Sequence, residues 1–274
     1  MSGVALRSAQ LQHPESGHSV IVAFDHGGNG VVPGGEDVPG TLSVLADSAA
    51  EGILVGPGLA RHAAAALGGP GRPRLVVALD LCVIDVLPGS EGPMRSHRQL
   101  IAPEEALRLG ASAAKVLLPV GLDAVDGYAD SARFVAAAAQ QCDRLGLPLI
   151  IEPALWGPRV PGETDELIAH AARVSVELGA SLLKIPAPRD LSVLRDIVAW
   201  SPVPVLLLGG APAGSDALAD DLAQWMGTGI AGLVVGRNVW SRPNPRHAVA
   251  ALVAAVHHGD RAACAKHLEL ASIT

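Results

Sequence analysis

Lysine is scarce in this chain, which has 17 arginines but only 3 lysines. Two of the three lie inside apolar, strand-like runs: Lys115 in Ala-Ala-Lys-Val-Leu-Leu-Pro-Val and Lys184 in Ala-Ser-Leu-Leu-Lys-Ile-Pro-Ala-Pro. Arginine stays protonated in proteins, whereas a buried lysine can lose its proton and act as an amine nucleophile. The pattern therefore indicates a reactive lysine. The alternative is a lysine at a strand end whose aliphatic side-chain carbons pack against the core while its ammonium group reaches water.

Aromatic residues and cysteines are also few. Aromatic residues make up 3% of the chain, so a large core has to be built from Ala, Val, Leu and Ile. The cysteines are Cys82, Cys142 and Cys264, an odd number at wide spacing. This excludes a disulfide framework and indicates reduced thiols in a cytosolic protein.

Excess positive charge and long apolar runs are missing as well. The net charge of −7 argues against nucleic acid as a partner, although a local site can still bind a small anion. No apolar run is long enough to span a bilayer, and the first ten residues lack the apolar core of a signal peptide. We expect a cytoplasmic protein with no membrane partner.

Short β-rich apolar runs alternate with Ala- and Leu-rich helical segments along the whole chain. Strands that are apolar on both faces belong to parallel sheets, and eight βα units in about 250 residues are typical of a closed barrel. The sequence therefore predicts one α/β domain over residues 1–274, a (β/α)8 TIM barrel. The expected strands are residues 19–24, 52–55, 75–79, 113–118, 149–151, 182–185, 205–208 and 232–235.

Helix ends support this alternation. Thr164 precedes Asp165 and Glu166, an N-terminal capping pattern, and that helix is expected to stop at Gly179. The preceding helix is expected to stop at Gly146, with Pro148 just beyond it.

Polar residues gather at the carboxyl ends of the expected strands, where barrel enzymes build their active sites. These residues are Asp25, His26, Asp80, Lys115, Glu152 and Lys184, with Gly209-Gly210 and Gly236-Arg237 at the last two strand ends. The Gly/Pro-rich stretches 27–40 and 88–93 follow strands at the same face.

Lys184, Lys115 and Glu152 are the first candidates for catalysis. If both lysines face the barrel interior, like-charge repulsion would lower the pKa of each. Glu152 emerges from the apolar run Leu-Ile-Ile, and such surroundings would raise its pKa toward the range useful for acid–base work. Pairing of Glu152 with one of the lysines is the alternative, and the two roles are compatible.

Asp25 and His26 follow Val-Ile-Val-Ala-Phe, so only one of them should enter the barrel unless the strand has already ended. We favour Asp25, which is in phase with Ala23, and assign His26 to loop support and substrate binding. Gly209, Gly210 and Gly236 can bring backbone amides close to a phosphate, and Arg237 can add a bidentate contact.

Other patterns carry less weight. Gly-Gly-Asn-Gly at 27–30 lacks the lysine and the spacing of nucleotide-binding loops. His257, His258, Cys264 and His267 raise the possibility of a metal site, but they lie away from the strand ends, and we interpret them as a solvated helix. Neither a metal nor another cofactor is expected.

Phe-Asp-His-Gly (24–27), Ala-Lys-Val-Leu-Leu (114–118), Ile-Glu-Pro (151–153), Leu-Lys-Ile-Pro (183–186), Leu-Gly-Gly (208–210) and Gly-Arg-Asn-Val-Trp (236–240) occur in this order. The set resembles the Schiff-base class I aldolase family, which includes archaeal-type fructose-bisphosphate, tagatose-bisphosphate and sulfofructose-phosphate aldolases. The resemblance implies that Lys184 is the Schiff-base lysine, Asp25 an active-site carboxylate, and the last two strand ends a phosphate site. The archaeal-type tyrosine acid/base has no counterpart, because the only tyrosine, Tyr128, lies in a helical segment; Glu152 is our substitute.

We therefore predict a metal-independent aldolase that acts on a phosphorylated ketose, with dihydroxyacetone phosphate as the ketone half. We expect it to be a homo-oligomer. One alternative is a transferase that uses the same lysine, such as a heptulosonate-type synthase or an autoinducer thiolase. Another is a barrel that senses a sugar phosphate without turnover.

Overall fold

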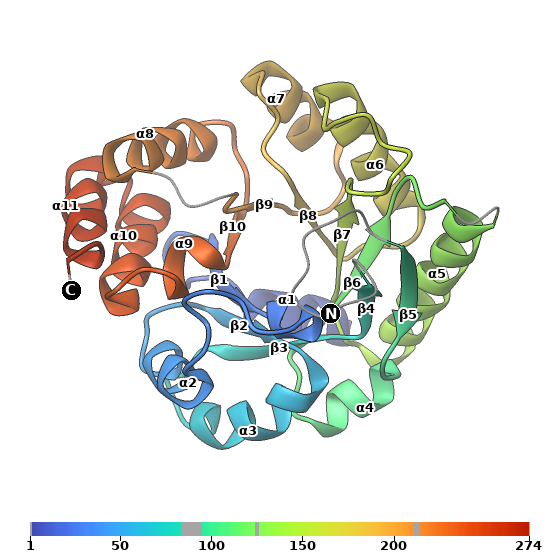
Figure 1. Ribbon diagram of the computed structural model, residues 1–274, viewed down its shortest axis with the longest axis horizontal. Coiled ribbons are helices and arrows are strands. Elements are labelled where there is room, and N and C mark those ends of the chain that lie inside the picture. Colours follow the sequence, from blue (N-terminus) through green and yellow to red (C-terminus); the bar gives the residue numbers. More distant parts are fainter. Residues whose placement is uncertain (1, 84–94, 124–125, 211–213, 274) are drawn as a thin grey trace.

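Eight parallel strands close into a barrel around which the helices are arranged, as expected for a (β/α)8 fold (Figure 1). The computed structural model describes residues 2–83, 95–123, 126–210 and 214–273. Around the barrel the strands follow the order β1-β10-β9-β8-β7-β6-β3-β2. Their bounds are β1 Ser19–Phe24, β2 Gly52–Val55, β3 Arg74–Ala78, β6 Ala113–Pro119, β7 Leu149–Ala154, β8 Leu182–Ile185, β9 Val205–Leu208 and β10 Gly232–Val235.

The helices run between and around these strands. They are α1 Gly3–Ala9, α2 Val38–Ala46, α3 Pro57–Leu67, α4 Pro103–Arg108, α5 Gly127–Leu145, α6 Asp165–Glu177, α7 Leu191–Trp200, α8 Ser215–Met226, α9 Arg237–Trp240, α10 Pro245–His258 and α11 Arg261–Ala271, with a short 3-10 turn η1 at His26–Asn29. Two expected helix ends have the predicted chemistry. The hydroxyl of Thr164 accepts from the amide of Leu167, and Gly146 closes α5 in the left-handed region at φ +65°.

A two-stranded antiparallel sheet is the main addition to the predicted fold. It consists of β4 (Asp80–Val83) and β5 (Ser96–Gln99) and follows β3 directly. Ser-His-Arg-Gln has no apolar alternation, so this segment does not have the pattern that predicts a strand. The stretch 88–93, expected to follow the third strand, lies outside the described residues. Within the described part of the chain, none of the helices combines the length and apolarity needed to cross a membrane.

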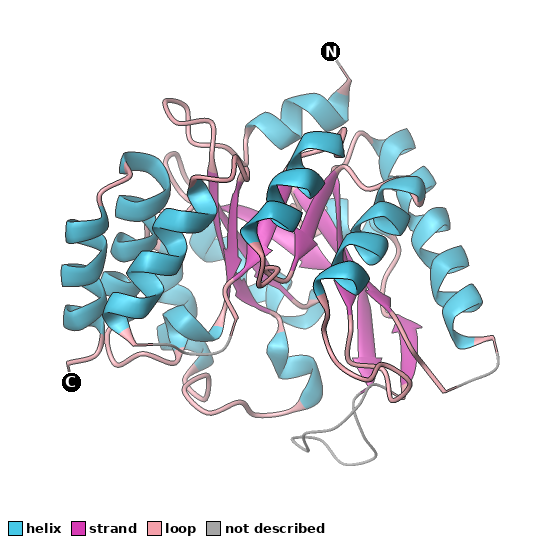
Figure 2. Cartoon of the chain, turned by 90° about the horizontal axis from the view of Figure 1, so that it is seen from above, coloured by secondary structure: helices cyan, strands magenta, loops and turns pink. Residues whose placement is uncertain are grey.

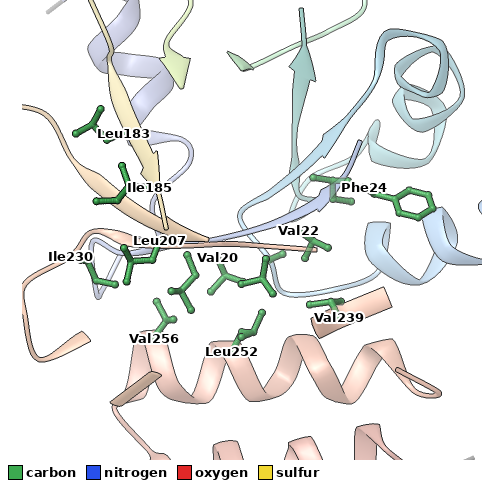
Figure 3. Close-up of a cluster of buried hydrophobic side chains, with 14 of the residues drawn as sticks. Val20, Val22, Phe24, Leu183, Ile185, Leu207, Ile230, Val239, Leu252 and Val256 are labelled. Carbon is green, nitrogen blue, oxygen red and sulfur yellow. The ribbon is translucent and has the colours of Figure 1, made fainter. Parts of the chain in front are cut away.

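The core has two layers, one inside the barrel and one between barrel and helices. Inside, Ile21, Leu54, Val76 and other inward residues pack with Leu11, which follows α1 at the amino end of the barrel. Figure 2 shows the strands in the middle of the molecule with helices around them. Outside, the other face of each strand packs against helices. Figure 3 shows Leu252 and Val256 of α10 beside the outward residues of β1. Because side chains alternate along a strand, these two layers also fix the direction of the side chains at the carboxyl ends of the strands.

Candidate active site

The chemistry-bearing side chains form one layer above the apolar interior of the barrel. Side chains two positions apart on a strand point to the same face. Interior apolar residues lie two positions before polar ones on five strands: Ala23 before Asp25, Ala78 before Asp80, Ala113 before Lys115, Ile150 before Glu152, and Leu182 before Lys184. On β2 and β10 the corresponding position is a glycine, Gly56 or Gly236. The alternation of buried strands therefore aims five polar groups at one space.

Four of these side chains, Asp25, Lys115, Glu152 and Lys184, form a connected lysine–carboxylate cluster. Lys184 Nζ donates to Glu152 Oε2 at 2.8 Å, and Lys115 Nζ lies 3.1 Å from the same oxygen. Lys115 Nζ also donates to Asp25 Oδ2 at 3.2 Å. The side chains of both lysines and of Glu152 are only 4–6% exposed. The alternative of a lysine reaching into water is therefore wrong for both lysines.

The electrostatics of the cluster correct two expectations. Burial alone would lower the pKa of Lys115, but Glu152, Asp25 and Asp80 outweigh it and raise this pKa above its ordinary value. The expected depression by a neighbouring lysine is therefore wrong for Lys115, because carboxylates stand between the two ammonium groups. Burial alone would likewise raise the pKa of Glu152, but Lys115 and Lys184 hold it below its ordinary value. The expected increase is wrong for Glu152.

Asp25 follows the same rule as Glu152. Burial would raise its pKa, but the ammonium groups of Lys115 and Lys184 hold it well below its ordinary value. Both carboxyl groups are therefore ionised at neutral pH. The cluster holds its charges in alternation, with Glu152 between the two lysines.

His26 enters the same space as Asp25. Strand β1 ends at Phe24, so the alternation that would send the two side chains to opposite faces no longer applies. The His26 ring packs edge-on against Trp240 at a centroid distance of 5.3 Å, and burial lowers its pKa. His26 and Asp25 both line the cavity described below.

The glycine-rich ends of β9 and β10 lie side by side. The side-chain amide of Asn238 donates to the carbonyl of Gly209 at 2.6 Å and connects the two ends. Gly210 has a φ of +62°, which favours glycine, and a Cβ on Gly209 would come within 2.5 Å of Val235. Arg237 is exposed at the start of α9. These ends are close-packed backbone with an exposed guanidinium beside them.

Asp80 and His97 form a buried pair that the sequence analysis did not identify. Asp80 Oδ2 accepts from the amide of Leu117 at 2.6 Å and lies 2.7 Å from His97 Nε2. His97 comes from β5, in register with Cys82 of β4. Asp80 had been noted only as a strand end, and the unpredicted β4–β5 pair is what brings His97 to it. Asp80 thereby joins the barrel to this small sheet beside Lys115.

The interpretation of the C-terminal His and Cys residues as a solvated helix is wrong for His257 and Cys264, whose side chains are buried, whereas His258 is exposed. His267 stacks on His247 at 5.3 Å between α10 and α11. Among the described residues, no three His, Cys, Asp or Glu side chains gather in a way that could hold a metal ion. Cys264 is held in the core by packing.

A cavity of about 840 Å³ opens above the lysine–carboxylate cluster. Its floor includes all four cluster residues and Asp80, and its walls come from the segments that follow β1, β2 and β3. It is large enough for a small organic substrate. A buried cluster of amines and carboxylates beneath such a cavity suits proton transfer and attack on a carbonyl group.

The fold places the lysine–carboxylate cluster and the cavity at the carboxyl ends of the barrel strands, where barrel enzymes build their active sites. The chain belongs to the DeoC/LacD family of aldolases, whose model matches residues 19–242. This confirms the resemblance to the class I aldolase barrels.

Similar proteins include enzymes with different printed activities. The chain is 31% identical to 2-amino-4,5-dihydroxy-6-oxo-7-(phosphonooxy)heptanoate synthase of Streptomyces griseus, over 88% of this chain and 85% of the relative. It is 28% identical to 2-amino-3,7-dideoxy-D-threo-hept-6-ulosonate synthase of Halobacterium salinarum, over 87% of this chain and 86% of the relative. The solved structure of a Schiff-base-forming fructose-1,6-bisphosphate aldolase aligns with a TM-score of 0.77 and 25% identity, over 92% of this chain and 99% of that one.

Proposed function

We propose that the protein is a metal-independent class I aldolase in which Lys184 forms a Schiff base with a phosphorylated ketose. The observation that carries this proposal is the buried hydrogen bond between Lys184 and Glu152 at the mouth of the barrel. An amine beside an ionised carboxylate can pass its proton on and attack a carbonyl carbon. The similar aldolase structure is described as Schiff-base-forming, which supports the same chemistry here.

Lys184 is the better nucleophile of the two lysines. Lys115 is held between Asp25 and Glu152, and its raised pKa keeps it as an ammonium ion. An ammonium ion cannot attack a carbonyl, but it can donate hydrogen bonds to a substrate oxygen. We therefore assign attack to Lys184 and the binding of a substrate oxygen to Lys115.

The reaction follows from these assignments. The Lys184 amine adds to the ketone carbon, and loss of water leaves a protonated imine that accepts electrons. A base removes the proton from the hydroxyl beyond the bond to be broken, and that carbon–carbon bond breaks to give an aldehyde and an enamine. Protonation of the enamine carbon and addition of water then release the ketone and restore the Lys184 amine.

Glu152 is our assignment for the base, with Asp25 as its partner. The lowered pKa of Glu152 keeps it as a carboxylate at neutral pH, the form that accepts a proton. Its oxygen is already 2.8 Å from the amine that becomes the imine. Tyr128, the chain's only tyrosine, is half-exposed on α5 and offers no substitute.

We place the phosphate of the ketone half at Gly209, Gly210, Gly236 and Arg237, with His26 beside it. Strand β9 neighbours β8, so this site adjoins Lys184. The name of the Streptomyces griseus relative describes a ketone next to a phosphonooxy-bearing carbon. Dihydroxyacetone phosphate has the same arrangement and is the ketone half that we propose.

Borohydride reduction in the presence of dihydroxyacetone phosphate, followed by peptide mass mapping, tests this proposal. The expected result is one adduct on Lys184. Lys266 is exposed on α11 and serves as an internal control, because non-specific labelling would reach it first. An adduct on Lys115 alone, or none with any ketose phosphate tried, would contradict the assignment.

A transferase that uses the same lysine is the second candidate. It is favoured by the likeness to the Halobacterium salinarum synthase, whose product is a heptulosonate. Product analysis with dihydroxyacetone phosphate and with an acyl-coenzyme A separates the two. Transfer of an acyl group, or turnover only with a preformed ketose donor and a second acceptor, would favour the transferase.

A further inference from the structure

The cavity above Lys184 opens to one side of the barrel. Among the inward positions of the active-site layer, β2 and β10 carry glycines. The space beside Gly236 is filled, because a Cβ there would come within 2.8 Å of the His26 ring and of the carbonyl of Ala23. A Cβ on Gly56 would meet nothing within 4 Å. The free space therefore lies over β2, whereas the proposed phosphate site lies over β9 and β10.

The walls on this side are apolar and partly open to solvent. Val31 is 75% exposed and Leu100 47%, and both line the cavity. Apolar side chains grouped around a binding cavity indicate contact with an apolar partner or ligand. They surround the face of the cavity where the aldehyde half would enter.

A second cavity lies beside the first, between two helices. It has a volume of about 620 Å³, is lined by α2, α3 and Arg72, and shares Val38, Leu59 and His62 with the first. From Leu59 to Ala66 its lining follows α3 for roughly 10 Å. Helices α2 and α3 lie next to each other below the barrel in Figure 1. Val38 and Leu59 therefore form an apolar part of the wall where the two cavities adjoin.

The charges around this side of the cavity favour an uncharged aldehyde. Within the described lining, Lys115 and Lys184 are bound in the lysine–carboxylate cluster, and the wall adds the carboxylate of Glu36 and the imidazoles of His26 and His62. In the second cavity, Arg72 is paired with Asp47 and also donates to the carbonyl of Ala46. Neither lysine is therefore left unpaired for a phosphate or carboxylate on the aldehyde, which would also meet Glu36 and apolar walls.

We propose that the aldehyde half carries an uncharged hydrocarbon chain or ring, seated against Val38 and Leu59 on the β2 side of the cavity. The inference rests on the proposed function. The enamine carbon attacks the aldehyde carbon and forms the new carbon–carbon bond, and the aldehyde oxygen takes a proton. Water then hydrolyses the imine and frees Lys184. The hydrocarbon substituent keeps its contacts throughout and sets the preference among aldehydes.

The first experiment separates the donor step from the choice of aldehyde. Deuterium exchange into dihydroxyacetone phosphate in heavy water measures enamine formation without any aldehyde; its absence in the wild-type protein would contradict the proposed function. With exchange established, kcat/KM is measured for propanal, hexanal, glyceraldehyde 3-phosphate and succinic semialdehyde. Each buried methylene contributes roughly fourfold, so hexanal should exceed propanal by at least about tenfold. Preference for either anionic aldehyde would overturn the inference.

The second experiment uses a blocking variant. Leu59→Trp adds bulk to the wall where the two cavities adjoin and should lower the ratio of hexanal to propanal kcat/KM at least about fivefold. Ala65→Trp is the matched control, because Ala65 is exposed on α3 and lies outside both cavities. Circular dichroism and deuterium exchange show whether each variant is folded. An unchanged ratio in folded Leu59→Trp would overturn the inference.

Discussion

Both ends of the barrel bury polar side chains, but Glu51 and Ser19 at the amino end bond to backbone groups, whereas the lysine–carboxylate cluster at the carboxyl end does not. At the amino end, Glu51 accepts from the backbone amide of Val20 at 2.7 Å, and Ser19 donates to the carbonyl of Leu11. His257 lies 2.8 Å from the Ser16 hydroxyl and 3.2 Å from Glu51. At the carboxyl end, the lysine–carboxylate cluster bonds side chain to side chain.

The difference indicates what each end does. Polar groups that bond to backbone fix the path of the chain, so their loss should cost stability. Polar groups that bond to one another leave the backbone ladder untouched and can exchange partners for a substrate. We therefore expect mutations in the cluster to reduce activity most, whatever stability they also cost, and mutations of Glu51 or Ser19 to reduce stability alone.

The largest effect is expected for Lys184→Arg. Arginine keeps the positive charge but cannot form an imine, so kcat should fall by about 10⁴-fold or more. Steady-state kinetics and borohydride trapping measure this. Lys266→Arg is the matched control and should behave as wild type. Substantial turnover in Lys184→Arg would mean that this cluster is not the catalytic centre.

Glu152→Gln should cause the second-largest loss of activity. The amide has the same shape but cannot accept the proton, so kcat should fall by about 10²–10⁴-fold. The same variant should still be trapped on Lys184 by borohydride, although more slowly. A loss of activity smaller than about tenfold would assign the proton transfer to another group.

Much of the carboxyl end of the barrel could be predicted from the sequence, because the alternation of side chains along a strand depends only on the order of neighbouring residues. The bounds of five barrel strands, including β8 with Lys184, are those predicted. The phase of Lys115 with Ala113 and of Lys184 with Leu182 correctly places both lysines inside. The family follows from the order of short motifs along these strands.

The pKa directions could not be predicted in this way. The direction of the pKa shift of Glu152 depends on whether its carboxylate oxygen contacts one lysine, two or none. The distances from that oxygen to the two Nζ atoms are set by strands that are neighbours in the barrel but far apart in sequence. The pairing of Asp80 with His97 was missed for the same reason, since it depends on the β4–β5 sheet. The cavity between α2 and α3 arises from helix packing, which leaves no pattern in a single segment.

Arg237→Ala tests the phosphate site beside the cluster. Loss of a charge-assisted contact should raise KM for dihydroxyacetone phosphate by about 10–100-fold and change kcat little. Unphosphorylated dihydroxyacetone should be used equally well by variant and wild type. Arg246→Ala, which removes another exposed arginine, is the control. An equal loss with both ketones would place the phosphate elsewhere.

Acid unfolding should reveal the charges of the cluster. Because the pKa values of Asp25 and Glu152 are lowered by folding, their ionised forms stabilise the protein above their ordinary values of 3.8 and 4.5. This stability should be lost as the pH falls below about 4.5. Urea unfolding at pH 7 to 3 should show a shallower decline for Glu152→Gln than for wild type. An equal slope would mean that Glu152 is not stabilised as a carboxylate.

Glu51→Gln should have the smallest effect on catalysis and tests the amino end. Its amide oxygen can still accept from Val20, but the charge beside buried His257 is lost. Weakening of these contacts should lower the free energy of unfolding by about 1–3 kcal/mol, measured in urea at pH 6. Activity per folded molecule should stay within about twofold, because Glu51 lies at the opposite end of β2 from Gly56. A fall in kcat comparable to that of Glu152→Gln would break the division between the two ends. Loss of stability without loss of activity is the expected result, because Glu51 holds the backbone at the amino end and takes no part in the chemistry proposed for the cluster at the carboxyl end.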